Sequence, residues 1–235
     1  MPAWAIEGVR RMIKTIGVLG GTGPQGRGLA LRWAVRGLDV VLGSRDPERA
    51  ARAAAELSGI LEGRGGAGAV SGASNLEAAS ADAVLVAVPY EAHARTLEGL
   101  AGALAGRIVI DCVNPLGFDK QGPFPVSVPE GSAAQQAQAL LPDARIVGAF
   151  HNVSAVLLAD LEIDDLETDV LVLGEDREDV AEVIALAELL PGVRALHAGR
   201  LRNAGQVEHL TANLIALNRR FKTHAGIRIT GAGLP

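Results

Sequence analysis

Residues 15–26 read TIGVLGGTGPQG, and this stretch decides the fold. Its first part is an apolar run of strand length, and glycines follow at positions 21, 23 and 26. Between a strand and a helix, Gly21 permits the tight turn, Gly23 lets a pyrophosphate approach the backbone, and Gly26 allows the helix to pack on the strand. Pro24 suits the first helical turn, where a backbone N–H has no helical partner. The spacing therefore predicts a dinucleotide-binding turn.

The rest of the chain repeats this strand–helix pattern. Strands are predicted at 15–20, 39–43, 83–88, 107–111, 145–149 and 169–174, with weaker candidates at 68–72 and 193–196. Helices are predicted at 24–37, 46–58, 91–105, 132–141, 176–190 and 203–221. The strands are continuous apolar runs, which is typical of strands buried on both faces of a parallel sheet. The pattern predicts an α/β protein with a Rossmann-type doubly wound parallel sheet and a small C-terminal α/β lobe.

This reading divides the chain into three parts. Residues 1–14 are an N-terminal extension and lead-in to the first strand, and residues 1–11 are expected to be frayed. Residues 15–150 form the dinucleotide-binding Rossmann domain, and residues 151–235 form the smaller C-terminal lobe. Residues 59–69 and 113–131 are rich in glycine or proline and are predicted to be loops, the second of them long enough to suggest a functional role.

Composition excludes several classes of protein. The chain has 235 residues, 49% of them hydrophobic, and a net charge of −5, which indicates a globular protein with an acidic balance and argues against a nucleic-acid partner. The longest apolar runs have strand length, so no membrane span is expected. A single cysteine, Cys112, is compatible with a reducing compartment, and a cytoplasmic location is expected. The five histidines are scattered along the sequence, so no metal site is expected.

The end of the second predicted strand distinguishes NADP from NAD. An NAD site carries an acidic residue there, which accepts a hydrogen bond from the ribose 2′-hydroxyl. This chain has Ser44 and Arg45 instead, and Arg49 follows one helical turn later. A serine hydroxyl and two guanidinium groups can bind a 2′-phosphate. The alternative is that both arginines are solvated, but a cation in the first turn of a helix is mildly unfavourable. The residues therefore favour NADP.

Several runs of sequence, taken in order, identify a family. They are GGTGPQGRGLALR at 20–32, VLGSR at 41–45, VPYE at 88–91, FHNVSA at 150–155, GED at 174–176, GRLRN at 199–203, RF at 220–221 and GIRI at 226–229. Together they cover residues 13–230 and resemble the NADPH-dependent F420 reductases (F420H2:NADP oxidoreductases). The first two runs occur in other NADP-binding proteins as well, whereas the full ordered set is much more specific.

The resemblance implies an 8-hydroxy-5-deazaflavin:NADP+ oxidoreductase. Such an enzyme transfers a hydride directly and reversibly between C4 of the nicotinamide of NADP(H) and C5 of the deazaflavin coenzyme F420. Matching by motif gives these cofactor-binding residues: Thr22, Gly23, Pro24 and Gln25 at the pyrophosphate; Ser44, Arg45 and Arg49 at the 2′-phosphate; Val88, Pro89 and Tyr90 beside the nicotinamide ribose; Ala155 near the nicotinamide; and Ala225 near the deazaflavin. Family members often carry tryptophan where this chain has Tyr90, and lysine where it has Arg49. The resemblance also implies a homodimer, with residues 151–235 completing the deazaflavin site and the dimer interface.

The residues themselves are compatible with this reaction. Hydride transfer between two cofactors needs proximity and orientation more than a protein acid or base, so no catalytic acid or base is required. We expect Asn114 and His151 at the cofactor cleft, with His151 as the one candidate to hydrogen-bond a ring substituent. The basic residues Arg200, Arg202, Arg219, Arg220, Lys222 and Arg228 either attract the phosphate and glutamate groups of F420 or form a solvated face. A stripe formed by Val207, Leu210, Leu214, Leu217 and Phe221 is expected to pack on the Rossmann domain or on a second subunit.

Two other functions remain open on the sequence. One is an NADP-dependent reductase of another small substrate, namely an imine, a keto acid or a flavin. The other is a non-catalytic module that senses NADP and regulates a partner. A second ligand cleft formed by residues 113–131, 150–155 and the C-terminus would separate the F420 enzyme from the sensor, because a sensor has no need of one.

Overall fold

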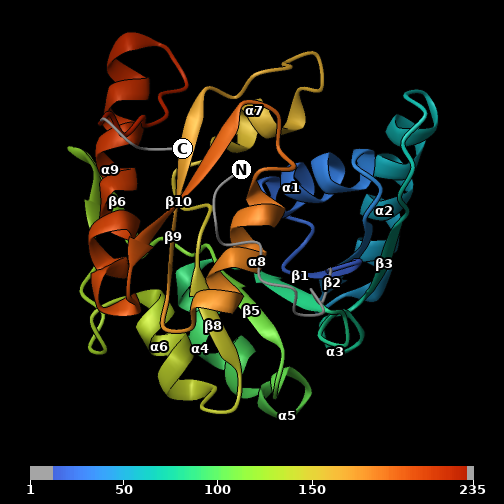
Figure 1. Ribbon diagram of the computed structural model, residues 1–235, viewed down its shortest axis with the longest axis horizontal. Coiled ribbons are helices and arrows are strands. Elements are labelled where there is room, and N and C mark those ends of the chain that lie inside the picture. The colour runs from blue at the N-terminus through green and yellow to red at the C-terminus, as the bar shows by residue number, and fades with distance from the viewer. Residues whose placement is uncertain (1–12, 232–235) are drawn as a thin grey trace.

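The computed structural model describes residues 13–231 (Figure 1). The expected fraying of residues 1–11 therefore concerns positions outside the described residues. The strands are β1 (Thr15–Leu19), β2 (Asp39–Ser44), β3 (Val70–Ser74), β4 (Ala83–Val86), β5 (Ile108–Asp111), β6 (Leu116–Asp119), β7 (Gly122–Pro125), β8 (Arg145–Gly148), β9 (Thr168–Gly174) and β10 (Val193–Gly199). The helices are α1 (Pro24–Val35), α2 (Pro47–Glu62), α3 (Asn75–Ala78), α4 (Tyr90–Glu98), α5 (Ala101–Leu104), α6 (Ala133–Leu140), α7 (Ala155–Ala159), α8 (Arg177–Ala187), the 3-10 turn η1 (Leu201–Asn203) and α9 (Ala204–Phe221).

The central sheet has the strand order β10-β9-β8-β5-β4-β1-β2-β3. Six neighbouring strands of this sheet, β8, β5, β4, β1, β2 and β3, are all parallel. They have the order of a Rossmann sheet, as predicted. The sheet departs from the predicted parallel arrangement at one pairing, because β9 pairs with β8 in the antiparallel direction. A parallel neighbour needs a crossover that carries the chain back to the opposite edge. Between β8 and β9 the only helix is the five-residue α7, so the chain re-enters the sheet from the edge that it has just left.

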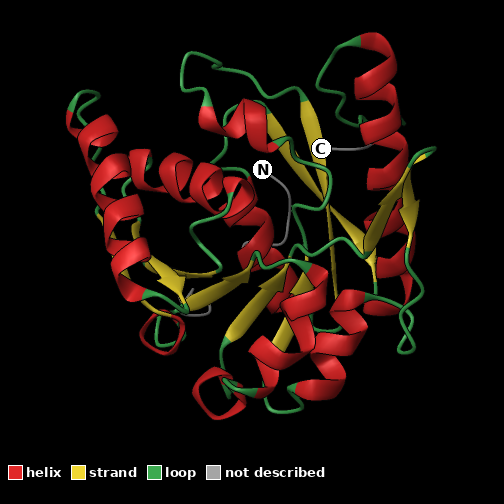
Figure 2. Cartoon of the chain, turned by 180° about the vertical axis from the view of Figure 1, so that it is seen from behind, coloured by secondary structure: helices red, strands yellow, loops and turns green. Residues whose placement is uncertain are grey.

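Side chains alternate between two apolar layers, one on each face of the sheet. Ile16 and Val18 of β1 belong to the cluster that includes Trp33 of α1, whereas Leu19 belongs to the cluster that includes Leu97 of α4. Figure 2 shows helices on both sides of the strands. This double covering explains why the strands are continuous apolar runs. Among the described helices, none is long and apolar enough to cross a membrane.

The largest difference from the predicted elements lies in residues 113–131. The sequence predicts an irregular loop, but β6 and β7 form an antiparallel hairpin there, with Leu116 opposite Pro125. Figure 1 shows this hairpin beside α9, and β7 packs on that helix. Each strand has only four residues and the hairpin contains glycine and proline, so the hydrophobic pattern is too short to reveal it. Two smaller differences are that α2 extends through Glu62 and that the predicted helix 91–105 is divided into α4 and α5.

Candidate active site: two clefts at the carboxyl edge of the sheet

The turn after β1 is closed by backbone contacts that leave no room for side chains. The Gly21 N–H donates to the carbonyls of Val18 at 3.1 Å and Gly43 at 3.0 Å. A Cβ on Gly21 would lie 2.9 Å from the Val18 carbonyl oxygen, and a Cβ on Gly26 would lie 2.9 Å from a methyl carbon of Val18. The absence of both side chains lets α1 begin directly against β1.

The first turn of α1 has unpaired backbone donors and no acidic side chain. Its N-cap, Gly23, provides no side-chain hydrogen bond, and Pro24 occupies the first helical position. The free N–H groups and the partial positive charge of the helix N-terminus favour an anion at this end.

A cleft of about 360 Å³ opens at this helix end, and we call it the turn cleft. It is lined by Gly20, Thr22, Gly23, Pro24, Gln25, Ser44, Arg45, Arg49, Asn75, Ala87, Val88, Pro89, Ala92 and Thr96. The structure therefore brings together the residues that the resemblance matches to the pyrophosphate and the 2′-phosphate, and two of the three matched to the nicotinamide ribose. The third, Tyr90, starts α4 but is not a lining residue, and its ring stacks on His93 with the ring centroids 6.3 Å apart.

The arginines of the turn cleft are free to bind an anion. Asp46, which lies between them in sequence, caps α2 by accepting from the Arg49 backbone N–H at 3.1 Å, and its own N–H donates to Ser44 Oγ at 3.1 Å. Within residues 13–231, the exposed guanidinium groups of Arg45 and Arg49 form no ion pair with a carboxylate. A 2′-phosphate fits this donor set, because guanidinium groups bind phosphate bidentately.

Sequence reasoning missed Asn75 and Thr96 as lining residues. Asn75 starts α3, and within the described part of the chain its buried Oδ1 has no hydrogen-bond partner. Ser74 and Glu77 form a capping box there, which marks a helix start at the carboxyl end of β3. That local signal predicts the position of Asn75, although it does not predict that the side chain lines a cleft.

A second cleft, of about 600 Å³, lies beside α9, and we call it the α9 cleft. It is lined by His151, Asn152, Val153, Ser154, Ala155, Val156, Thr211, Leu214, Ile215, Asn218, Arg219, Lys222, Thr223, His224 and Ala225. A second cleft was expected, but its predicted composition is wrong in one part. Residues 113–131 do not line it, because their hairpin packs on α9 through β7.

His151 lines the α9 cleft and has an unusual buried ring. Its side chain is almost fully buried, and among the described residues neither Nδ1 nor Nε2 has a hydrogen-bond partner. Burial lowers the pKa of His151 to about 4, so the ring is neutral at pH 7 and offers one donor and one acceptor. The carbonyl of His151 accepts from Asn114 Nδ2 and from Thr211 Oγ1, both at 2.9 Å. Asn114 thus lines neither cleft and holds the backbone of His151.

One hydrogen bond connects the two clefts. Gln25 Nε2, in the turn cleft, donates to the carbonyl of Phe150 at 3.4 Å, and Phe150 immediately precedes His151 of the α9 cleft. Phe150 has a φ of 65°, which is uncommon for a residue other than glycine, and Trp33 packs edge-to-face on its ring with the centroids 5.6 Å apart. The two clefts are therefore neighbours along the carboxyl edge of the sheet, where open α/β sheets bind ligands.

The C-terminal basic residues occupy different environments. Arg219 and Lys222 line the α9 cleft, whereas Arg200 lies 3.5 Å from Glu175 and Arg228 lies 2.9 Å from Asp169. Of the six basic residues considered for the deazaflavin site, two therefore line the α9 cleft, Arg219 and Lys222. Of the apolar stripe on the same helix, Val207 and Leu214 are buried, whereas Leu217 and Phe221 are exposed.

His93, on the buried side of α4, belongs to a network of ionisable groups. His93 Nε2 is 2.7 Å from Asp111 Oδ2, and His93 Nδ1 is 2.9 Å from Gln136 Oε1. The Gln136 amide nitrogen donates to Glu130 at 3.2 Å, so its oxygen faces the histidine. Both ring nitrogens of His93 thus face acceptors, an arrangement that favours the protonated imidazolium. Burial alone would lower its pKa, but the charge and hydrogen bond of Asp111 outweigh burial and raise the pKa.

Glu208 of α9 belongs to the same region. Its carboxylate accepts from the backbone N–H groups of Ala133, at 2.8 Å, and Ala134, at 3.1 Å, and so caps α6 from another helix. The side chain is fully buried, and burial raises the pKa of Glu208 to about 7 in spite of these hydrogen bonds. Within residues 13–231, no three His, Cys, Asp or Glu side chains are arranged to hold a metal ion.

Known proteins resemble this chain in both sequence and structure. Residues 15–115 match a family model described as "NADP oxidoreductase coenzyme F420-dependent". The F420-dependent NADP reductase of Methanothermobacter thermautotrophicus is 40% identical over 228 residues, which cover 94% of this chain and 97% of that protein. The enzyme of the same name from Methanocaldococcus jannaschii is 39% identical over 220 residues, covering 92% and 97%.

A solved structure from Arthrobacter sp. FB24, provisionally assigned as an F420-dependent NADP reductase, has the same fold. It superposes with a TM-score of 0.75 at 28% identity and covers 93% of this chain and 100% of its own. The aligned regions extend over nearly the full length of this chain and of both the Methanothermobacter and Methanocaldococcus proteins. This chain belongs to the family of F420-dependent NADP reductases.

Proposed function

We propose that this protein is an oxidoreductase that interconverts NADPH and oxidised F420 with NADP+ and reduced F420. Written in one direction, NADPH, F420 and a proton give NADP+ and F420H2, and the reaction is reversible. The bound cofactors supply the chemistry, in which a hydride passes from the nicotinamide to the deazaflavin ring. The relatives' shared activity supports this assignment, and so does the presence of two clefts where a single nucleotide would need one.

The observation that carries the proposal is the hydrogen bond between Gln25 and the Phe150 carbonyl. It makes the wall of the turn cleft continuous with the wall of the α9 cleft. Two cofactors that exchange a hydride must lie in contact, with the reacting atoms about 3–3.5 Å apart. Neighbouring clefts on one rigid sheet edge meet this requirement without a moving domain.

In the turn cleft, the protein's task is to bind and orient NADP(H). The N-terminus of α1 and the turn residues Thr22 to Gln25 hold the pyrophosphate. Arg45 and Arg49 bind the 2′-phosphate with Ser44. Val88 and Pro89 flank the nicotinamide ribose, and Tyr90 supports Pro89 from the first turn of α4.

In the α9 cleft, the task is to bind the deazaflavin. His151 lines this cleft, and its ring nitrogens, buried and without a partner among the described residues, supply one donor and one acceptor for a polar ring substituent that reaches them. Asn114 acts through the backbone of His151 and not on the ligand itself. Arg219 and Lys222 supply positive charge for the phosphate and glutamate groups, and Ala155 and Ala225 leave room for a flat ring. No side chain is required as a catalytic acid or base, since the proton of the reaction is available from solvent.

A direct assay tests the function. The protein is mixed with NADPH and oxidised F420, and the loss of deazaflavin absorbance is followed. Rapid loss of absorbance supports the proposal, and the same experiment with FMN, an imine and a keto acid provides the comparison. Turnover of one of those three compounds, with no turnover of F420, would overturn it in favour of another NADP-dependent reductase. Tight NADPH binding with no turnover of any acceptor would favour a sensor.

We also propose a homodimer formed through α9 and the β6–β7 hairpin. The large apolar side chains Phe118, Phe124, Leu217 and Phe221 of these neighbouring elements are 60%, 43%, 42% and 63% exposed. Water-exposed aromatic groups on adjacent elements are typical of a protein interface. In this arrangement residues 15–150 bind NADP, and residues 151–235 complete the deazaflavin site and provide the interface.

We place the enzyme in the cytoplasm. Cys112 is buried and unpaired, and burial raises the pKa of its thiol, which makes it inert and gives the fold no dependence on an oxidising compartment.

A further inference from the structure

The last described residues, 224–231, form an extended segment that we call the C-terminal tail. After α9 the chain reverses, and the Ala225 N–H donates to Asn218 Oδ1 at 2.6 Å. The tail then runs beside the start of β9, where the Asp169 N–H donates to the Ile227 carbonyl at 2.7 Å. Because Ala225 lines the α9 cleft, the path of the tail determines one wall of that cleft.

A buried carboxylate anchors this tail, together with hydrogen bonds from Ile227 to Thr168 Oγ1 at 3.3 Å and from Arg228 to the Gly192 carbonyl at 3.1 Å. Asp169 is fully buried, and it accepts from Arg228 Nη1 at 2.9 Å and from the Ile229 N–H at 2.7 Å, both of which belong to the tail. Arg194 of β10 donates to both oxygens of Asp169, at 3.1 and 2.6 Å, and also to the Ile229 carbonyl at 2.7 Å. Burial opposes ionisation, but the hydrogen bonds from Arg194, Ile229 and Arg228 outweigh it and lower the pKa of Asp169 to about 2. Asp169 is therefore a charged carboxylate at neutral pH.

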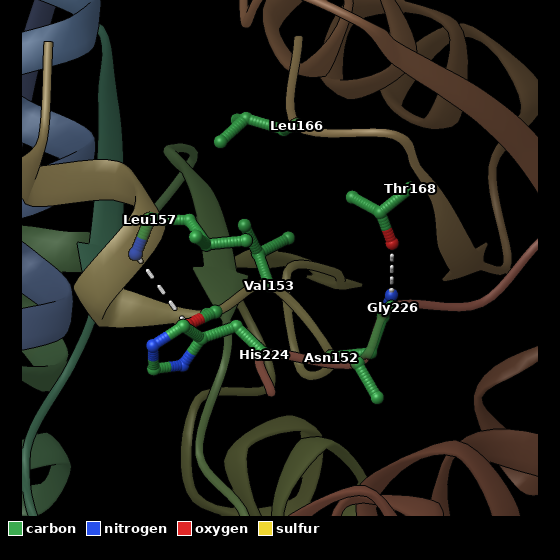
Figure 3. A pocket seen from close by; sticks show the side chains of 9 residues that line it. Asn152, Val153, Leu157, Leu166, Thr168, His224 and Gly226 are labelled. Carbon is green, nitrogen blue, oxygen red and sulfur yellow. Dashed lines mark hydrogen bonds between the residues drawn. The ribbon is translucent and has the colours of Figure 1, made fainter. Parts of the chain in front are cut away.

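The tail approaches β9 so closely that only glycine fits at position 226. A Cβ on Gly226 would lie 2.7 Å from Thr168 Oγ1. Figure 3 shows this junction, in which Thr168 faces both Gly226 and Asn152. The space left between the tail and residues 152–157 is about 10 Å³, which is no more than one water molecule needs. Asn152 Nδ2 donates to Thr168 Oγ1 at 3.1 Å and to the Asp169 carbonyl at 2.8 Å. The junction thus also holds the residue that follows His151.

We propose that Asp169 and Arg228 are positioning residues for the α9 cleft. Their ion pair holds the C-terminal tail on β9 and so fixes the position of Ala225 in the cleft wall. Thr168 contacts both the tail and Asn152, and Asn152 directly follows His151, so the position of His151 also depends on the tail. The turn cleft contains no residue of this junction. This inference rests on the proposed function, in which the α9 cleft binds the deazaflavin. It follows that weakening the ion pair impairs binding of F420 and leaves binding of NADPH unchanged.

The first test compares Arg228→Ala with Arg228→Lys and with the control Arg177→Ala. Arg177 is an exposed arginine of α8 that lines neither cleft. Amide hydrogen exchange of Ile227 and Ile229 reports on the tail, quenching of F420 fluorescence gives the Kd for F420, and steady-state kinetics separates KM from kcat. For Arg228→Ala we expect exchange at both amides to accelerate about tenfold or more, and Kd and KM for F420 to rise about tenfold, with KM for NADPH unchanged. Arg228→Lys should restore part of the loss, because a cation is retained, and Arg177→Ala should match the wild type.

A second variant tests the same idea without removing a charge. Gly226→Ala leaves Asp169 and Arg228 in place but pushes the tail off Thr168, so it should reproduce the loss of F420 binding. Faster exchange in the tail with an unchanged Kd for F420, in either variant, would refute the inference, because the tail would then be no part of the cleft wall. Failure of the wild-type protein to bind F420 at all would instead refute the proposed function, whatever the tail does.

Discussion

Gln25 and Phe150 are 125 positions apart in sequence, and a hydrogen bond from the Gln25 amide to the Phe150 carbonyl, 3.4 Å long, brings them together. Gln25 belongs to the first turn of α1, and Phe150 follows β8. In the proposed function, this bond is the point at which the nucleotide site of the turn cleft and the deazaflavin site of the α9 cleft share a wall. Its geometry therefore bears directly on the distance between two bound cofactors.

Replacing Gln25 tests this relationship. In Gln25→Leu the bond to Phe150 is lost and a side chain of similar size remains, so we expect kcat to fall about 3–10-fold while the melting temperature changes little, because misplacement of reacting groups slows transfer steeply. Stopped-flow measurement of the hydride-transfer step checks this. Gln138→Leu, at an exposed position of α6, is the matched control and should retain wild-type rates. A Gln25 variant that transfers hydride as fast as the control would show that this bond does not align the cofactors.

Arg45 provides the test of cofactor choice. Arg45→Ala removes a charge-assisted contact to the 2′-phosphate, and such contacts are worth about 1.5–3 kcal/mol, so KM for NADPH should rise about 10–100-fold. KM for NADH, which lacks that phosphate, should not change. Arg52→Ala is the control, since Arg52 is a nearby arginine of α2 that does not line the turn cleft and lies 3.7 Å from Glu48. Equal losses for both nucleotides would mean that Arg45 does not recognise the 2′-phosphate.

Glu208 should make stability depend on pH. Its pKa is about 7 in the folded protein, because of burial, against 4.5 for an ordinary glutamate, so the folded state retains a proton that the unfolded state has lost between pH 4.5 and 7. Stability from this group is therefore present below pH 4.5 and is lost as the pH rises through 7, by up to about 3 kcal/mol.

The variant Glu208→Gln does not lose stability in this way, because a glutamine side chain does not ionise. Its melting temperature relative to the wild type should therefore rise between pH 5 and pH 8, by about 2–4 °C for each kcal/mol. Thermal unfolding at a series of pH values measures the difference, and Glu188→Gln, at an exposed glutamate after α8, should show no such trend. A difference that stays constant across this range would mean that Glu208 does not titrate there.

The proposed dimer makes a prediction about the exposed aromatic side chains. Phe118→Ser combined with Phe221→Ser removes two large apolar groups from the surface formed by the hairpin and α9. Light scattering after size exclusion should then give the mass of a monomer, whereas the wild type gives twice that mass. Leu76→Ser is the control, because Leu76 is 59% exposed but lies on α3. A double variant that remains dimeric would place the interface elsewhere.

Local sequence predicted the parts of the site that depend on local geometry. The glycines of the first turn and the arginines after β2 each act through neighbours within a few residues, so their spacing is informative. The reversal of β9 and the anchoring of Arg228 by Asp169 depend on pairs that are distant in sequence, and no periodicity records such pairs. Asn114 illustrates the difference, since the sequence predicts that it lies at the cofactor cleft but does not predict its hydrogen bond to the His151 carbonyl, 37 positions along the chain.

The antiparallel β9 also affects the order in which the two halves of the site form. Because β9 runs against β8, its first residues lie at the carboxyl edge of the sheet and can receive the last segment of the chain. Every residue that lines the turn cleft precedes position 97, whereas the α9 cleft needs residues 151–225. A chain made from its N-terminus can thus present all residues of the turn cleft, the proposed nucleotide site, well before the residues of the α9 cleft, which are complete only after position 225 has emerged.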